Sequence, residues 1–150
     1  MAEFTKDGLL RRIKQSILEE FENKNGHTIQ RHINVELNSL KNRCLSARMF
    51  ATSFHGNDSD KYIMSTLTDE IYMGGTINYI LAWLNDGFWE EDLIIEMEYS
   101  ENTGYGYQYN RITRDADYIV CNAVRIVLRK LDHYEFIPFL IVTAYPCILK

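Results

Sequence analysis

Residues 26–43, GHTIQRHINVELNSLKNR, concentrate side chains that can transfer protons and bind anions. The stretch contains His27 and His32, two of the chain's four histidines, together with three basic residues. Histidine exchanges a proton near neutral pH, and arginine offers a fixed fork of donors to a phosphate or carboxylate. A single histidine is more often structural than catalytic, so the question is whether the fold brings these groups together.

His32 and Arg43 can share a site only if the chain turns between them. They are eleven residues apart, which on one continuous helix means the same side but roughly 16 Å along the axis. Neither side chain spans that gap. Asn34 is the expected turning point and helix N-cap, because asparagine is disfavoured inside helices and favoured at their start. The spacing therefore permits the two side chains to converge.

Charge is unevenly distributed along this acidic chain, which has a formal net charge of −5 at pH 7. Residues 24–48 contain five basic residues against the single acid Glu36, whereas residues 86–101 contain seven acidic residues and no basic one. A locally positive cleft attracts phosphate even when the remaining surface is acidic. The acidic run is either a solvated face or a docking surface for a basic partner, and the sequence leaves both open.

Hydrophobic periodicity divides the chain into a helical first half and a strand-rich second half. Apolar residues at helical spacing predict helices over residues 7–22, 34–49, 58–73 and 76–84. The period then changes to two, which predicts strands over residues 93–100, 105–112, 118–130 and 135–148. This order predicts an α+β fold, in which N-terminal helices pack on a C-terminal antiparallel β-sheet with short hairpins between adjacent strands.

The 150 residues fit a single domain, since no linker or internal repeat divides them. The cysteines, Cys44, Cys121 and Cys147, are odd in number and lack metal-like spacing. We expect them to be small buried hydrophobic residues and not a disulfide framework. No apolar run reaches the length of a membrane-spanning helix, and the N-terminus lacks the order of a signal peptide.

Several short segments follow one another in an order typical of a known family. They are GHTIQRH at 26–32, Arg43, ATSF at 51–54, WL at 83–84 and VTAYP at 142–146. This arrangement resembles the bacterial RNase A-like toxin domain, found at the C-terminal end of contact-dependent growth-inhibition proteins and other polymorphic toxins. The H-T-x-x-R-H and T-A-Y-P elements are moderately specific together and weak apart. One departure is Asn34–Val35, where relatives usually have a Gly-Lys-like turn.

The resemblance implies an RNase A-like fold without disulfides and a ribonuclease that uses neither metal nor cofactor. It places the active-site residues at His32, Arg43, Thr143 and Tyr145. Residues 1–150 then form one toxin domain, with an N-terminal helix and residues introduced for expression in 1–25 and the catalytic core in 26–150. The oligomeric state stays open.

The resemblance also implies a biological setting. The substrate is RNA, with transfer RNA one candidate, and the activity serves competition between bacteria. A cognate immunity protein neutralises the toxin. The domain is expected to be part of a larger secreted or cell-surface bacterial protein and to act in the target-cell cytoplasm.

These four side chains suit the cleavage of RNA, which carries its own nucleophile in the 2′-hydroxyl. His32 suits acid–base transfer, worth roughly 10²–10⁴ in rate, and Arg43 suits a phosphate that gains charge. Tyr145 can donate a hydrogen bond or a proton, although an ordinary phenol pKa of about 10 makes it a weak acid. Thr143, on the same strand face as Tyr145, suits the phosphate or a base edge. A 2′,3′-cyclic phosphate is the expected product, and His27 is a second acid–base candidate behind His32.

Two other classes of protein remain open. The net charge, a pI near 5.4 and the acidic run favour a non-catalytic binding module, such as an immunity or inhibitor protein. An RNA-binding module that does not cleave would need stacking aromatics, which the alternating Tyr105, Tyr107 and Tyr109 would supply. Such a ladder is more often sheet packing. Acid–base, cationic and hydroxyl residues in a recognisable order favour the ribonuclease.

Overall fold

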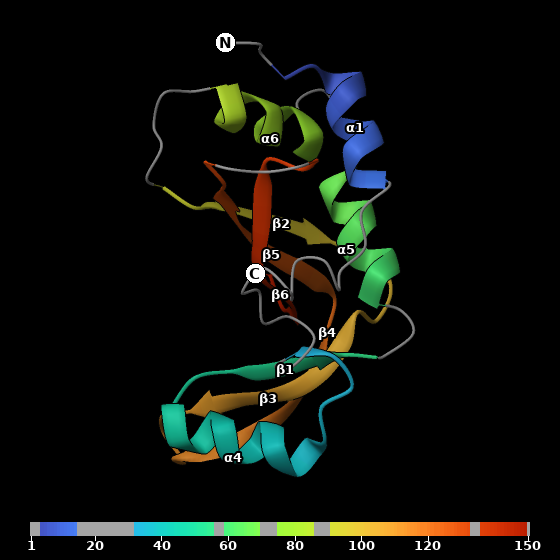
Figure 1. The fold of residues 1–150 in the computed structure, drawn as a ribbon. Helices are drawn as coiled ribbons and strands as arrows, with labels where there is room; N and C mark the ends of the chain where they lie inside the picture. Colours follow the sequence, from blue (N-terminus) through green and yellow to red (C-terminus); the bar gives the residue numbers. More distant parts are fainter. Residues whose placement is uncertain are drawn as a thin grey trace.

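The computed structural model describes residues 4–14, 32–55, 59–69, 75–85, 91–132 and 136–149, which form two lobes (Figure 1). The larger lobe consists of helices α1 (Lys6–Lys14), α5 (Ser59–Leu67) and α6 (Thr76–Asn85) and strands β2 (Leu93–Glu98), β5 (Ala123–Lys130) and β6 (Phe139–Cys147). The smaller lobe consists of helix α4 (Leu37–Ala47) and strands β1 (Ala51–Phe54), β3 (Gly104–Asn110) and β4 (Asp115–Cys121). No helix in these ranges is long and apolar enough to cross a membrane.

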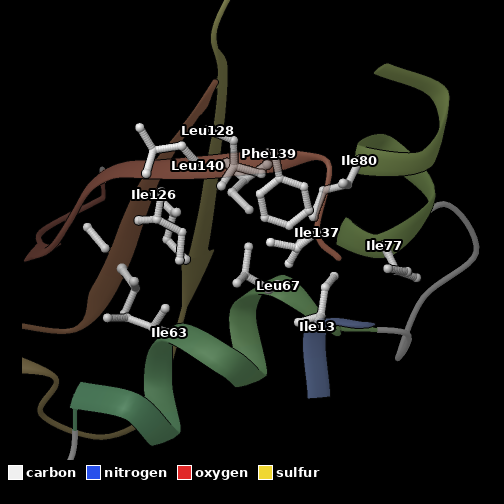
Figure 2. Packing of buried hydrophobic residues seen from close by; sticks show 14 of the residues in the cluster. Ile13, Ile63, Leu67, Ile77, Ile80, Ile126, Leu128, Ile137, Phe139 and Leu140 are labelled. Carbon is white, nitrogen blue, oxygen red and sulfur yellow. The ribbon is translucent and has the colours of Figure 1, made fainter. Parts of the chain in front are cut away.

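The larger lobe holds the main hydrophobic core. Its three strands pair antiparallel in the order β2–β5–β6. Helices α1, α5 and α6 bury an apolar stripe against this sheet, because their Leu and Ile residues recur at helical spacing. Figure 2 shows side chains of both layers meeting between the helices and the sheet, among them Ile13, Leu67, Ile80, Ile126 and Phe139. Each such buried side chain contributes about 1.5–3 kcal/mol.

The smaller lobe has its own apolar cluster, between α4 and a sheet of order β1–β3–β4. Leu40 and Cys44 of the helix pack on one face of that sheet, which carries the alternating Tyr105, Tyr107 and Tyr109. The tyrosine ladder is therefore sheet packing, as period-two spacing usually indicates.

The predicted α+β class is confirmed, but two details of the strands differ from the prediction. The expected single strand 118–130 is two strands in different sheets, because the chain changes lobe at Asn122, whose N–H donates to the Cys147 carbonyl (3.2 Å). The expected order of hairpins is also wrong, since β2 pairs with β5 and not with β3. The third helix ends at Leu67, earlier than expected. The predicted continuation of the first helix to residue 22 lies outside the described residues.

The two lobes meet where β1 and β3 reach the end of β6. The Thr52 hydroxyl donates a 2.6 Å hydrogen bond to the Pro146 carbonyl, and both residues are buried. A Cβ atom on Gly104 would lie 2.5 Å from Cγ of Pro146, so this close approach requires glycine. The end of the VTAYP segment is thus clamped between the two sheets.

All three cysteines are buried free thiols, as their spacing predicted. Burial raises the pKa of Cys121 to about 12, and the neighbouring Cys147 adds to the shift. Burial is also the main cause of the raised pKa at Cys147 and Cys44. These thiols hold their protons and serve as core residues.

Candidate active site

The segment that follows His32 runs beside strand β1. Ile33 forms a parallel bridge with Phe54, the Asn34 N–H donates to the Phe54 carbonyl (3.1 Å), and the Val35 N–H donates to the Ser53 hydroxyl (3.0 Å). The N–H groups of Asn34 and Val35 are thus both taken up by β1. The strand therefore fixes where His32 lies.

Asn34 is a turning point, with a φ of 53° in the left-handed region that asparagine tolerates better than most residues. The prediction that it caps the helix is wrong. The N-cap is Glu36, in extended conformation (φ −64°, ψ 144°) and without a side-chain cap bond. The helix begins later than expected because residues 33–35 are hydrogen-bonded or bridged to β1.

His32 is held through its ring nitrogen Nδ1, which is 3.1 Å from the Thr52 carbonyl oxygen. A carbonyl oxygen only accepts, so Nδ1 carries a hydrogen, and in the neutral ring Nε2 is then the nitrogen with the lone pair. Thr52 therefore makes two hydrogen bonds that link the site: its carbonyl accepts from His32, and its hydroxyl donates to the Pro146 carbonyl. It joins the His32 segment to the end of β6.

Tyr145 on β6 lies against His32, with ring centroids 5.3 Å apart and planes inclined by 44°. Phe50 packs on the same phenol ring at a centroid distance of 5.4 Å. The structure thus brings together two of the residues singled out in the sequence, one from near each end of the chain. Both side chains are half-buried, so the pair lies at the surface where the lobes meet.

Arg125 is the cation that the structure places on Tyr145. Its Nη1 donates to the phenol oxygen at 3.0 Å, and its guanidinium carbon lies 5.6 Å from the ring centroid. Its Nε and Nη2 both donate to Glu96 Oε2, at 3.0 and 2.7 Å. Burial lowers the pKa of Arg125, but the hydrogen bonds to Tyr145 and Glu96 outweigh burial and raise it. This guanidinium is a permanent charge.

Sequence reasoning missed Arg125, and its signal is visible only once strands are paired. Arg125 stands directly opposite Glu96 on β2 and opposite Tyr145 on β6. Cross-strand neighbours of this kind interact directly. Period-two spacing shows which face of β5 Arg125 occupies, but not which strands flank it.

Thr143 lies two residues before Tyr145 on β6, and the pairing with β5 is regular between them. The two side chains therefore share a face of the sheet, while Ala144 between them is buried on the other. The Thr143 hydroxyl oxygen is buried and has no hydrogen-bond partner among the described residues.

Arg43 is half-buried on α4, one residue before the buried Cys44. It belongs to the smaller lobe, whereas Thr143 and Tyr145 belong to the larger one. A cation that is hydrogen-bonded to Tyr145 is Arg125, on β5 of the larger lobe. His27, the second acid–base candidate, lies outside the described residues.

A cavity of about 340 Å³ opens beside this group, between the lobes. Its wall includes three arginines, two aromatic rings and an amide: Arg48, Arg111, Arg125, Phe50, Tyr109 and Gln108. Two of these, Phe50 and Arg125, also contact Tyr145. The cavity thus adjoins the group around His32, and arginine is the only charged residue type among those that line it.

Comparisons with known proteins agree with this architecture. A chain of the crystal structure of a CdiA-CT/CdiI complex from Y. kristensenii superposes with a TM-score of 0.64, covering 81% of this chain and 98% of that one. The two are 19% identical, a level at which the likeness shows the fold. The comparison with curated proteins finds no significant match.

The family comparison reaches further. Residues 26–146 match the family described as the bacterial CdiA-CT RNAse A domain. The matched range begins with the GHTIQRH segment and ends with VTAYP, the two outermost segments expected to mark it. The chain belongs to the bacterial CdiA-CT RNAse A domain family.

Proposed function

We propose that the chain is a metal-independent endoribonuclease toxin that cleaves RNA by attack of the 2′-hydroxyl on the adjacent phosphate. The products are a 2′,3′-cyclic phosphate and a free 5′-hydroxyl. The observation that carries the proposal is the packing of His32 on Tyr145, 5.3 Å between ring centroids, beside the guanidinium of Arg125. An acid–base group, a hydroxyl donor and a cation thus lie close together in a member of a ribonuclease family.

His32 acts as the general base in this proposal. The Thr52 carbonyl holds the hydrogen on Nδ1, which leaves Nε2 to accept the proton of the 2′-hydroxyl. The 2′-oxygen then forms a bond to phosphorus as the bond to the 5′-oxygen breaks, and the leaving 5′-oxygen takes up a proton from the Tyr145 phenol or from water. The imidazolium that results keeps its hydrogen bond to the Thr52 carbonyl, which stabilises the positive charge in the transition state.

Tyr145 supplies a hydrogen bond where negative charge develops. Arg125 already donates to the phenol oxygen, so the phenol's own hydrogen points elsewhere and can be donated to a phosphate oxygen or to the leaving 5′-oxygen. The fixed positive charge of Arg125 strengthens that donation. Preorganised donors of this kind are worth roughly 10²–10³ in kcat.

Thr143 and Arg43 complete the proposed site. Thr143 shares the sheet face of Tyr145, and its place in the site is taken from the residue order of the family. Arg43 is assigned to the phosphate from the residue order that the chain shares with the family. Arg125 acts with them through Tyr145, as a positioning residue.

The same family membership supports a role in competition between bacteria. The matched solved structure is a complex of CdiA-CT with CdiI. We propose that a cognate immunity protein neutralises this chain, that the domain is delivered as the C-terminal part of a larger CdiA-type protein, and that it cuts RNA in the target-cell cytoplasm. Membership also favours the toxin over the alternative of an acidic immunity protein.

Incubation of the purified chain with transfer RNA, with and without EDTA, tests the proposed function. We expect cleavage at the same rate in both conditions, with 2′,3′-cyclic phosphate ends detected by mass spectrometry. Transfer RNA that stays intact in both conditions would refute the ribonuclease. Cleavage that EDTA abolishes would refute the metal-independent mechanism, and 5′-phosphate ends would refute attack by the 2′-hydroxyl.

A further inference from the structure

We propose that the cavity between the lobes is a second nucleotide subsite, which binds the phosphate and base next to the scissile phosphate in a single-stranded RNA. This inference rests on the proposed function. The volume of about 340 Å³ falls in the range of ligand pockets, about 300–1,000 Å³. Phe50 and Arg125 line the cavity and also contact Tyr145, so the cavity adjoins the place where the scissile phosphate would bind.

The charge of the cavity suits a phosphate. Arg125 is engaged by Glu96, but no ion pair forms at Arg48 or Arg111 within the described ranges. No acidic residue is among those that line the cavity. Two exposed guanidiniums therefore direct their charge to one opening, where a phosphodiester would bind in exchange for counterions.

The backbone at Arg48 is a second and independent observation. Arg48 ends α4 in the left-handed conformation (φ 54°, ψ 39°), with its N–H bonded to the Cys44 carbonyl. Glycine is the usual residue at this position of a helix, because a side chain is strained there. Strained residues of this kind cluster at functional sites. An arginine at position 48 therefore makes the end of α4 less stable than a glycine would, but it places a positive charge at the cavity.

Arg111 is held at the cavity by a rigid hairpin turn between β3 and β4. The Asn110 side-chain oxygen accepts from the N–H groups of Ile112 (2.9 Å) and Thr113 (3.1 Å). The Arg114 N–H donates to the Asn110 carbonyl at 2.7 Å. The turn therefore fixes the backbone of Arg111 beside the cavity, from which its exposed side chain can reach a phosphate.

The remaining wall suits a nucleobase. Phe50 has 38% of its surface exposed and lines the cavity, so it offers an aromatic residue on which a base would stack. The amide of Gln108 offers both donors and an acceptor to a base edge. Base stacking tolerates any sequence, whereas the amide adds a preference for particular bases.

Binding of uncleavable 2′-O-methyl oligonucleotides tests the subsite, with Arg48→Gly as the variant. Glycine suits the left-handed conformation, so the variant keeps the fold. The matched control is Arg114→Gly, since Arg114 is also an exposed arginine at positive φ (57°) but lies outside the cavity. Both variants lose one positive charge and should melt at or above the wild-type temperature.

We expect the wild type to bind a tetranucleotide about tenfold more tightly than a dinucleotide. Arg48→Gly should lose most of that gain and reduce the salt slope by about 0.7, the value for one single-strand phosphate contact. Arg114→Gly should match the wild type. Equal effects of the two substitutions would overturn the subsite, as would equal weakening of both oligonucleotides by Arg48→Gly. The subsite would also be overturned if Arg48→Gly weakened the binding of hexaglutamate but left the binding of both oligonucleotides unchanged. That result would favour an acidic protein partner.

Because these oligonucleotides cannot be cleaved, the subsite and the proposed function fail separately. A wild type that binds with the expected length dependence but leaves transfer RNA intact supports the subsite and refutes the ribonuclease. A wild type that cleaves RNA while Arg48→Gly behaves like Arg114→Gly refutes the subsite alone.

Discussion

At the scale of single residues, the proposed chemistry depends on hydrogen bonds that fix how His32 and Tyr145 are oriented. The Thr52 carbonyl sets the His32 tautomer, and Arg125 occupies an acceptor position of the Tyr145 oxygen. Thr52 thus supports His32, and Arg125 supports Tyr145. The two reacting groups can therefore be tested independently.

Substitution Tyr145→Phe removes the hydroxyl and keeps the ring that packs on His32 and Phe50. We expect kcat to fall about 10²-fold, since one preorganised donor to the phosphate is lost. The melting temperature should change little. Tyr79→Phe, at a tyrosine with 64% of its surface exposed on α6, is the matched control and should keep wild-type kcat. Equal kcat for both variants would exclude the Tyr145 hydroxyl from the reaction.

Cys121 predicts how stability depends on pH. Its pKa is raised to about 12 in the folded chain, against about 8.5 for an exposed thiol. Between these values the unfolded chain binds fewer protons, so the free energy of unfolding falls as pH rises. Its stabilisation is complete below about pH 8.5. In urea unfolding under reducing conditions, the free energy of unfolding of the wild type should fall between pH 8 and 10. The fall should be about 1–2 kcal/mol smaller in Cys121→Ala. Identical losses would show that the thiol keeps an ordinary pKa in the fold.

At the scale of helices and strands, β1 positions both halves of the site. Thr52 accepts from His32 and donates to Pro146, next to Tyr145. The sequence segment ATSF is expected in the family, but its role is visible only when β1 lies between the His32 segment and β6. A buried strand of four residues thus connects segments that are far apart in the chain.

Thr52→Val tests this connection. Valine keeps the shape but leaves the Pro146 carbonyl without its donor, which should cost about 1–3 kcal/mol. We expect kcat to fall as well, because the end of β6 is no longer tied to the strand that orients His32. Thr66→Val is the matched control, since Thr66 is a buried threonine that donates to the Tyr62 carbonyl within α5. We expect Thr66→Val to lose a similar amount of stability and to keep the wild-type kcat. If Thr52→Val also kept the wild-type kcat, the proposed link between β1 and the site would be contradicted.

The strand pattern also shows what the sequence could and could not predict. Period-two spacing located β2, β3 and β6 approximately, since it reflects which side chains face the core, but it predicted no strand at β1. It missed the break at Asn122, because Cys121 and Ala123 on either side are both buried and the apolar run continues. Partner strands are set by long-range packing, which local spacing does not encode. For this reason Arg125 was not among the predicted site residues, whereas His32 and Tyr145 were named as candidates from the order of the motifs.

At the scale of the whole molecule, the acidic net charge is compatible with an RNA substrate because the charges are separated. Within the acidic run, Glu96 and Asp92 on or beside β2 pair with Arg125 and Arg129 of β5. Exposed pairs of this kind add little stability, about 0–1 kcal/mol, but they compensate negative charge locally. The cavity between the lobes keeps its positive residues. The two-lobe shape thus places a cationic opening beside the His32–Tyr145 pair.

The central claim is that His32 transfers the proton of a 2′-hydroxyl. An oligodeoxynucleotide with a single ribonucleotide offers one such hydroxyl, and initial rates in EDTA compare the wild type with His32→Ala. The control is His55→Ala, at an exposed histidine whose ring packs against that of Tyr105 with 5.0 Å between the ring centroids. We predict cleavage only after the ribonucleotide, a rate 10²–10⁴-fold lower for His32→Ala and an unchanged rate for His55→Ala. Equal rates for wild type and His32→Ala, or cleavage of the all-deoxy strand, would contradict the account.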